Sequence, residues 1–199
     1  MIKAGLTGSI GMGKSTTAEM FRAEGILVYD ADATVHELYK NEAVELVEKN
    51  FPGTERNGQI DRQELAKRVL GNQEEMKKLE SIIHPLVHKK EREFTEKAKS
   101  TGEQLIILDI PLLFEAGGYN RVDRIIVVTA PFNVQRDRVL SRPEMTEDKF
   151  QAILSRQVPD EEKRNRADYV IDTSKGMDAA RREVSAIIKE LTQNSVQHD

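Results

Sequence analysis

Short apolar runs alternate along the chain with longer segments in which apolar residues recur every three or four positions. The runs cover residues 2–7, 25–29, 104–109, 124–129 and 167–172. Runs of this length are typical of buried strands, whereas the spacing between them is helical. The clearest helical stripe comprises Met177, Ala180, Val184, Ile187, Ile188 and Leu191. Strands alternating with helices predict an α/β fold, a three-layer sandwich with a five-stranded parallel sheet covered on both faces.

The segment between the second and third strands is too long for one crossover. Its pattern predicts a helix over about 33–49, a turn-rich loop over 50–58 and a short helix capped by Asp61. Residues 72–100 are rich in Glu and Lys and carry an apolar helical stripe, which we expect Pro85 to interrupt. We therefore expect one domain over 1–199 with a helical insertion.

Composition narrows the class of protein. The 199 residues are 38% hydrophobic and 32% charged without a long apolar run, which predicts a soluble protein that does not enter membranes. With 30 basic and 34 acidic residues the net charge is −4, so a nucleic-acid partner is disfavoured. There are no cysteines, hence no disulfides or thiolate sites, and no leader precedes the first strand. We expect a cytoplasmic location.

The first strand runs into a phosphate-binding motif, G-x-x-x-x-G-K-[ST], over residues 8–15. Glycines let the backbone curl so that successive N–H groups point at one anion, and the following helix adds its positive end. Lys14 would contact the β- and γ-phosphates, and the Ser15 hydroxyl would be a ligand of Mg²⁺. An incidental glycine-rich turn is the alternative, but a strand before and a helix after favour phosphate binding. The expected ATP-binding residues here are Gly8, Gly11, Met12, Gly13, Lys14, Ser15 and Thr16.

Carboxylates follow two of the predicted strands. Asp30 and Asp32 come after the second strand and Asp109 closes the third. Ligands of open α/β sheets bind at the carboxyl ends of strands, so we expect these acids on the rim of the phosphate loop. One of the first two would cap the next helix and the other would be catalytic. Asp109 matches the Walker-B position, where a carboxylate reaches Mg²⁺ directly or through water.

Two helices after the fourth strand carry arginines at positions 136, 138 and 142, and Arg156 ends the second. Cationic helices beside a phosphate site are suited to a closing lid. Because a site needs fewer arginines, most would be solvated in ion pairs. Of these arginines, Arg142 is the first candidate for a contact with phosphate, and Arg136 and Arg156 are the next.

Two further features have open alternatives. His84 precedes Pro85 in the insertion and would be either a hydrogen-bonded structural residue or part of a site. The apolar segment 110–118 either packs in the core or lines a substrate pocket. The base-reading Asn-Lys-x-Asp string of GTPases is absent from the sequence. A small phosphotransferase with a lid, using ATP, is the class that remains.

Several segments together resemble one family, dephospho-coenzyme A kinase. They are Gly8-Ser9-Ile10-Gly11-Met12-Gly13-Lys14-Ser15, Asp30-Ala31-Asp32, Gly58-Gln59-Ile60-Asp61-Arg62, Ile83-His84-Pro85, Pro111-Leu112-Leu113-Phe114-Glu115 and Ala167-Asp168-Tyr169-Val170-Ile171-Asp172. They occur in that family's order and span nearly the whole chain. The resemblance implies phosphorylation of the ribose 3′-hydroxyl of dephospho-coenzyme A by ATP, the last step of coenzyme A synthesis, on a P-loop NTPase fold.

The resemblance also implies roles for regions and residues. It places a helical substrate-binding subdomain at about 33–100 and a lid at about 136–157. Asp32 matches the family's base and Arg142 its lid arginine. His84, Leu112 and Phe114 match positions on the substrate side. We expect a monomer or weak homo-oligomer acting on small molecules, and two alternatives remain open, a nucleoside or nucleotide kinase and an ATP-dependent binding switch without chemistry.

Overall fold

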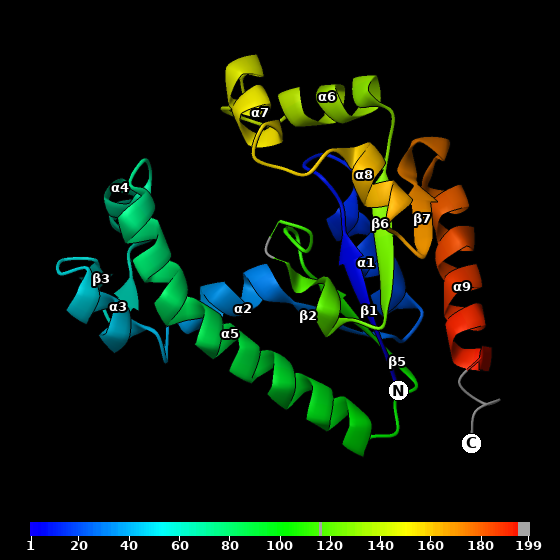
Figure 1. The fold of residues 1–199 in the computed structure, drawn as a ribbon, viewed down its shortest axis with the longest axis horizontal. Coiled ribbons are helices and arrows are strands. Elements are labelled where there is room, and N and C mark those ends of the chain that lie inside the picture. The colour runs from blue at the N-terminus through cyan, green and yellow to red at the C-terminus, as the bar shows by residue number, and fades with distance from the viewer. Residues whose placement is uncertain (116, 195–199) are drawn as a thin grey trace. The chain divides into compact units, whose positions relative to one another are not determined.

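The chain, in a computed structural model, is described over residues 1–115 and 117–194. It divides into two compact units. The first comprises Met1–Tyr29 and Ala98–Asp199, and the second comprises Asp30–Lys97. The first unit is built on a five-stranded sheet in the order β2-β5-β1-β6-β7 (Figure 1). Its strands are β1 Ile2–Thr7, β2 Leu27–Asp30, β5 Leu105–Asp109, β6 Arg124–Thr129 and β7 Tyr169–Asp172. The α/β fold with a five-stranded parallel sheet is confirmed.

Helices α1 (Lys14–Ala23) and α9 (Met177–Asn194) cover one face of this sheet. Phe21 of α1 and Val184 of α9 are fully buried there, together with Leu6 and Ile126 from the strands. Side chains alternate between the faces of a strand, so Thr129 points the other way. Its hydroxyl donates to the Asp160 carboxylate of α8 (Asp160–Asn165) at 2.8 Å. Helix α1, which follows the phosphate loop, thus packs on one face of the sheet, and α8 is bonded to the other face.

Helices α6 (Phe132–Leu140) and α7 (Glu147–Leu154) follow β6 and lie beyond its carboxyl end (Figure 1). Arg142, expected on the first of these helices, lies after it, because Ser141 is the C-cap. The short helix α8 and the 3₁₀ turns η1 (Gly118–Arg121) and η2 (Thr173–Lys175) were not expected. Their brevity explains this, since a segment of three to six residues shows no helical periodicity.

The second unit contains α2 (Ala31–Leu38), α3 (Val44–Asn50), α4 (Arg62–Val69) and most of α5 (Gln73–Ser100). The expected single helix over 33–49 is wrong. The Tyr39 carbonyl accepts the N–H of Ile60 at 2.8 Å instead of continuing the helical ladder, and the chain turns before α3. The expected cap is confirmed, since Asp61 Oδ1 accepts the backbone N–H groups of Gln63 and Glu64.

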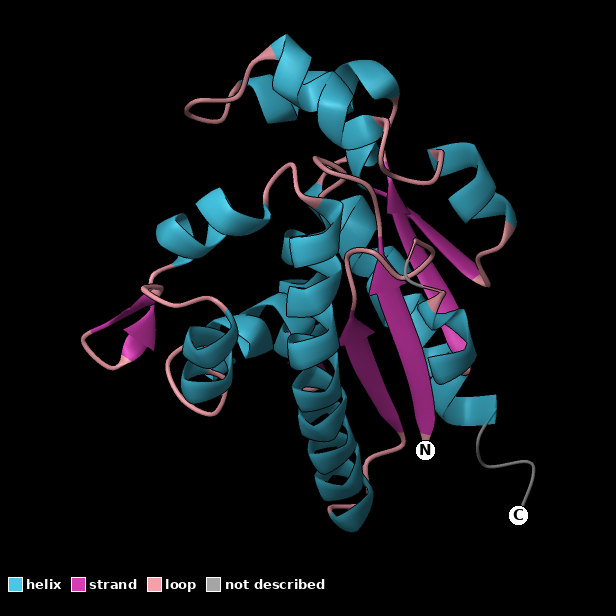
Figure 2. Ribbon diagram, turned by 60° about the vertical axis from the view of Figure 1, so that its left-hand side comes forward, coloured by secondary structure: helices cyan, strands magenta, loops and turns pink. Residues whose placement is uncertain are grey.

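Helix α5 runs through Pro85 without interruption, contrary to expectation (Figure 2). An internal proline costs a helix about 3 kcal/mol. Leu79 and Ile83 are 8% and 6% exposed in the core of this unit. Burial of each such side chain contributes roughly 1.5–3 kcal/mol, which offsets the cost of the proline.

The predicted loop 50–58 contains part of a small hairpin, β3 (Glu55–Arg56) and β4 (Gln59–Ile60) (Figure 2). Asn57 and Gly58 connect the strands with φ values of 55° and 80°. Two positive φ angles are those of a type I′ turn, for which Asn-Gly is the preferred sequence. The signal for this hairpin was therefore present in the sequence.

Glu48 holds the start of the hairpin, because its carboxylate accepts the backbone N–H groups of Gly53, Thr54 and Glu55 at 2.7, 2.9 and 2.7 Å. These hydrogen bonds lower the pKa of Glu48, and the bond from Gly53 has the largest effect. A carboxyl whose pKa is lower in the folded state stabilises the fold above its unfolded value of about 4.3, and this contribution is lost as the pH falls through the folded pKa.

We expect Glu48→Gln to be less stable than the wild type at pH 7 and the difference to shrink as the pH falls below about 4. Urea unfolding at both pH values measures it. Glu80→Gln, on an exposed part of α5, is the control and should match the wild type at pH 7. If Glu48→Gln lost the same amount of stability at both pH values, the role of the ionised carboxylate would be contradicted.

Candidate active site

The phosphate loop has the backbone shape that its sequence predicts. Gly11 and Gly13 adopt φ values of 79° and 93°, a region that side chains disfavour. A Cβ on Gly8 would lie 2.6 Å from the Val128 carbonyl oxygen, and one on Gly11 would lie 2.5 Å from Val139 Cγ2. Glycine at 8 and 11 therefore lets β6 and α6 approach the loop closely.

The loop ends at the N-terminus of α1, where the expected anion site lies. Its N-cap is Gly13, which has no side chain to accept the first N–H groups, and no acidic residue occupies the first turn. Ser15 and Thr16 are exposed there. Unscreened N–H groups and the positive end of the helix dipole make this terminus suitable for phosphate.

The structure brings together two of the predicted residues, Lys14 and Asp109. The Lys14 ammonium donates to Asp109 Oδ1 in an ion pair, and the side chains are 16% and 4% exposed. Asp109 ends β5, the strand beside β1. A cation and an acid are therefore fixed beside the phosphate loop, where the cation can meet a phosphate and the acid a metal ion.

Hydroxyl and carboxylate oxygens from Ser15 and Asp109 are the hard donors that Mg²⁺ prefers. Within the described residues no cluster of three or more His, Cys, Asp or Glu side chains suits a metal. Mg²⁺ in kinases is typically held by one or two protein groups together with the phosphates of the nucleotide. Ser15 of the loop and Asp109 of β5 fit this mode of binding.

The arginines in and just after α6 and α7 differ in their contacts. Arg136 forms an ion pair with Glu147 at 2.8 Å, and Arg138 donates to Thr173 Oγ1 at 2.8 Å. Within residues 1–115 and 117–194, no side-chain hydrogen bond or ion pair engages Arg142 or Arg156, and both are exposed. They are therefore better placed than Arg136 to receive an anion.

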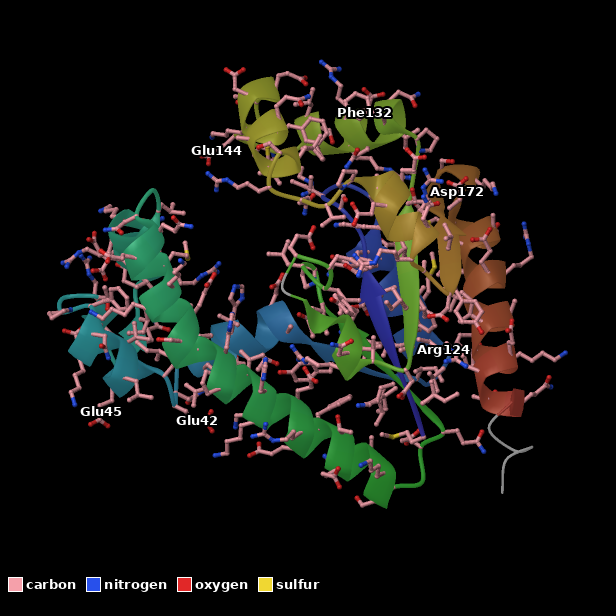
Figure 3. The ribbon with its side chains drawn as sticks, viewed as in Figure 1. Glu42, Glu45, Arg124, Phe132, Glu144 and Asp172 are labelled. Atoms are coloured by element: carbon pink, nitrogen blue, oxygen red, sulfur yellow. The ribbon has the colours of Figure 1, made fainter. Side chains whose placement is uncertain are left out.

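A cavity of about 630 Å³ lies in the same unit, beside the phosphate loop. Its lining includes Ser9 and Met12 of the loop, Phe132 of α6 and Asp172 of β7. Figure 3 shows Phe132 at the start of α6 and Asp172 at the carboxyl end of β7. The volume is in the range of small-molecule sites.

Sequence reasoning missed a buried ion pair that fixes the chain after α7. Lys163 Nζ lies 2.9 Å from Glu115 Oε1, and the lysine is fully buried. The same oxygen accepts the backbone N–H of Val158 at 2.9 Å. A lone lysine has no sequence signal of burial. Glu115, however, belongs to the Pro111 to Glu115 segment, one of the segments that carry the sequence resemblance.

Asp30 and Asp32 have different surroundings. Asp30 is the N-cap of α2, and its Oδ1 accepts the N–H of Ala33 at 2.8 Å. Asp32 lies within the first turn of that helix. The capping role thus belongs to Asp30, which leaves Asp32 as the candidate catalytic acid of the pair.

The candidate substrate residues lie in both units. His84 is in α5, where its ring stacks on that of His88 with centroids 6.3 Å apart. Leu112 is 48% exposed, while Phe114 is 6% exposed. The Arg166 guanidinium lies 4.8 Å from the centroid of Phe114. Leu112 offers apolar surface to a ligand, whereas Phe114 anchors the segment beneath it.

None of the helices in the described ranges combines the length and apolar character that a membrane crossing requires.

Comparison with known proteins identifies the family. A family model described as dephospho-CoA kinase matches residues 2–179. A dephospho-CoA kinase of Mesorhizobium japonicum is 58% identical over 191 residues, covering 96% of this chain and 97% of the relative. The crystal structure of a Thermus thermophilus protein matches with a TM-score of 0.83 at 35% identity, over 96% of this chain and 98% of that one. A dephospho-CoA kinase structure from Campylobacter jejuni gives 0.67 at 26% identity, over 96% and 97%. The chain therefore belongs to the dephospho-CoA kinase family.

Proposed function

We propose that this chain transfers the γ-phosphoryl group of ATP to the ribose 3′-hydroxyl of dephospho-coenzyme A, giving coenzyme A and ADP. The observation that carries the proposal is the N-terminus of α1, which has no side-chain cap and no acidic residue in its first turn, with Lys14 and Asp109 paired beside it. Membership of the family supports the choice of acceptor.

In this proposal the phosphate loop and Lys14 hold the β- and γ-phosphates, and Arg142 adds a cation from the segment after α6. The Asp32 carboxylate orients the 3′-hydroxyl and accepts its proton. A bond forms between the 3′-oxygen and the γ-phosphorus, the β–γ bridging bond breaks, and ADP leaves. Ser15 and Asp109 would hold Mg²⁺ together with the phosphates, and the ion would neutralise part of their charge.

The acceptor is proposed to bind to the unit of residues 30–97, within the subdomain of about 33–100, and to Leu112 and the segment around Phe114. His84 would contact it there. Residues 136–157 would act as the lid. The proposal also includes a cytoplasmic monomer or weak homo-oligomer, consistent with a sequence that lacks cysteine.

An acceptor assay tests the proposal. Purified protein is incubated with ATP, Mg²⁺ and either dephospho-coenzyme A or a panel of nucleosides and nucleoside monophosphates, and ADP formation is measured. We expect dephospho-coenzyme A to be the preferred acceptor. Preference for a member of the panel would indicate a nucleoside or nucleotide kinase, and ATP binding without turnover would indicate a binding switch. Either result would overturn the proposal.

A further inference from the structure

One residue of the phosphate loop, Ile10, is held by two side chains at the ends of the proposed lid, both far from it in sequence. Gln135 Nε2, from α6, donates to the Ile10 carbonyl oxygen at 2.8 Å. The Ile10 N–H donates to Gln157 Oε1 at 3.1 Å, just beyond α7. Both backbone polar groups of Ile10 are thus bonded to side chains at the two ends of the proposed lid. We refer to Gln135 and Gln157 as the glutamine clamp.

Close packing on the α6 side fixes one arm of this clamp. Gln135 is only 3% exposed. A Cβ on Gly11 would lie 3.0 Å from the Gln135 carbonyl oxygen, so the backbone of α6 lies directly against the loop. A buried amide has few alternative partners, and its hydrogen bond therefore fixes its position.

The second arm has its own anchor. Val158, the residue after Gln157, donates its N–H to Glu115 Oε1 at 2.9 Å. The same oxygen forms an ion pair with the buried ammonium of Lys163 at 2.9 Å. Gln157 therefore extends from a backbone segment that is fixed to the loop after β5.

We infer that Gln135 and Gln157 are positioning residues that keep the lid and the phosphate loop in register for phosphoryl transfer. This inference rests on the proposed function. Ile10 comes immediately before Gly11, within the phosphate loop of residues 8–15. Neither glutamine needs to contact the reacting atoms. Displacements of about 1 Å in such a framework cost up to about 100-fold in rate.

The test uses Gln157→Met, which keeps the length of the side chain and removes its acceptor. We expect kcat to fall at least tenfold, while the Kd for ADP and the Tm stay close to wild type, because the residues of the phosphate loop themselves are unchanged. Hydrogen exchange at the Ile10 amide, followed by NMR, should accelerate at least tenfold. This amide readout does not depend on which acceptor the enzyme uses, so it separates failure of the inference from failure of the proposed function.

Gln151→Met is the matched control. Gln151 is an exposed glutamine of α7 that donates to Glu147 at 2.9 Å, away from the loop. It should retain wild-type kcat and Ile10 exchange. The inference would be overturned if Gln157→Met kept kcat within twofold of the wild type, or if its kcat, ADP affinity and Tm all fell together. Unchanged Ile10 exchange would also overturn it.

Discussion

Lys14→Met is expected to lower kcat/KM by about 10²–10³-fold, the usual cost of removing one group that stabilises developing charge in a transition state. The Lys14 ammonium lies at the start of α1 beside Asp109. In the proposed reaction it would stabilise the negative charge that develops on the β–γ bridging oxygen as the bond to the γ-phosphorus breaks. Methionine keeps the apolar stem and removes only that charge.

Steady-state kinetics with ATP and dephospho-coenzyme A measure the effect, and a calorimetric titration measures ATP affinity. Lys189→Met, at an exposed position of α9, is the control and should behave as the wild type. Turnover of Lys14→Met within threefold of the wild type would remove Lys14 from the phosphate site.

Asp32→Asn is expected to lower kcat by about 10²–10⁴-fold, the range of a lost general base. The asparagine amide can still orient a hydroxyl but cannot take its proton. Because Asp32 is assigned to the acceptor and not to ATP, the affinity for ATP should change little. A fall in kcat with preserved ATP binding separates this variant from Lys14→Met.

The neighbouring acid supplies a matched control. Asp30 caps α2, and asparagine is as good an N-cap as aspartate. Asp30→Asn should therefore keep most of the wild-type kcat, measured in the same assay. If Asp32→Asn turned over normally, or Asp30→Asn were the more damaged of the two, the assignment of the base would be wrong.

Much of the first unit was predictable because its signals are local. Each buried strand is a continuous apolar run, and the phosphate loop concentrates its chemistry in residues 8–15. Asp109 was expected on the rim of the phosphate loop because it ends a strand, and the structure pairs it there with Lys14. Such local patterns agree with the structure because strands buried in a sheet require apolar side chains.

The second unit was harder to predict because contacts distant in sequence overrode local signals. Tyr39 ends α2 through a bond to Ile60, which no local pattern reveals. Pro85 is a local helix breaker, yet the apolar stripe around it keeps α5 whole. The Asn57-Gly58 turn, in contrast, could have been predicted from its sequence alone.

The glutamine clamp shows the same limit within the site. Gln135 and Gln157 are 125 and 147 residues from Ile10. Glutamine has no characteristic spacing that marks it as a partner of a peptide group. Such residues become visible only when the fold brings the lid segments to the loop.

The central claim is that the phosphate loop delivers the γ-phosphoryl group to one hydroxyl of one acceptor. The most direct test combines ATP labelled in the γ-phosphate with dephospho-coenzyme A and locates the label by ³¹P NMR and mass spectrometry of the product. The account predicts a single added phosphate at the ribose 3′-position and an equal amount of ADP. Label that remained in ATP, was released as inorganic phosphate, or appeared at another position would contradict it.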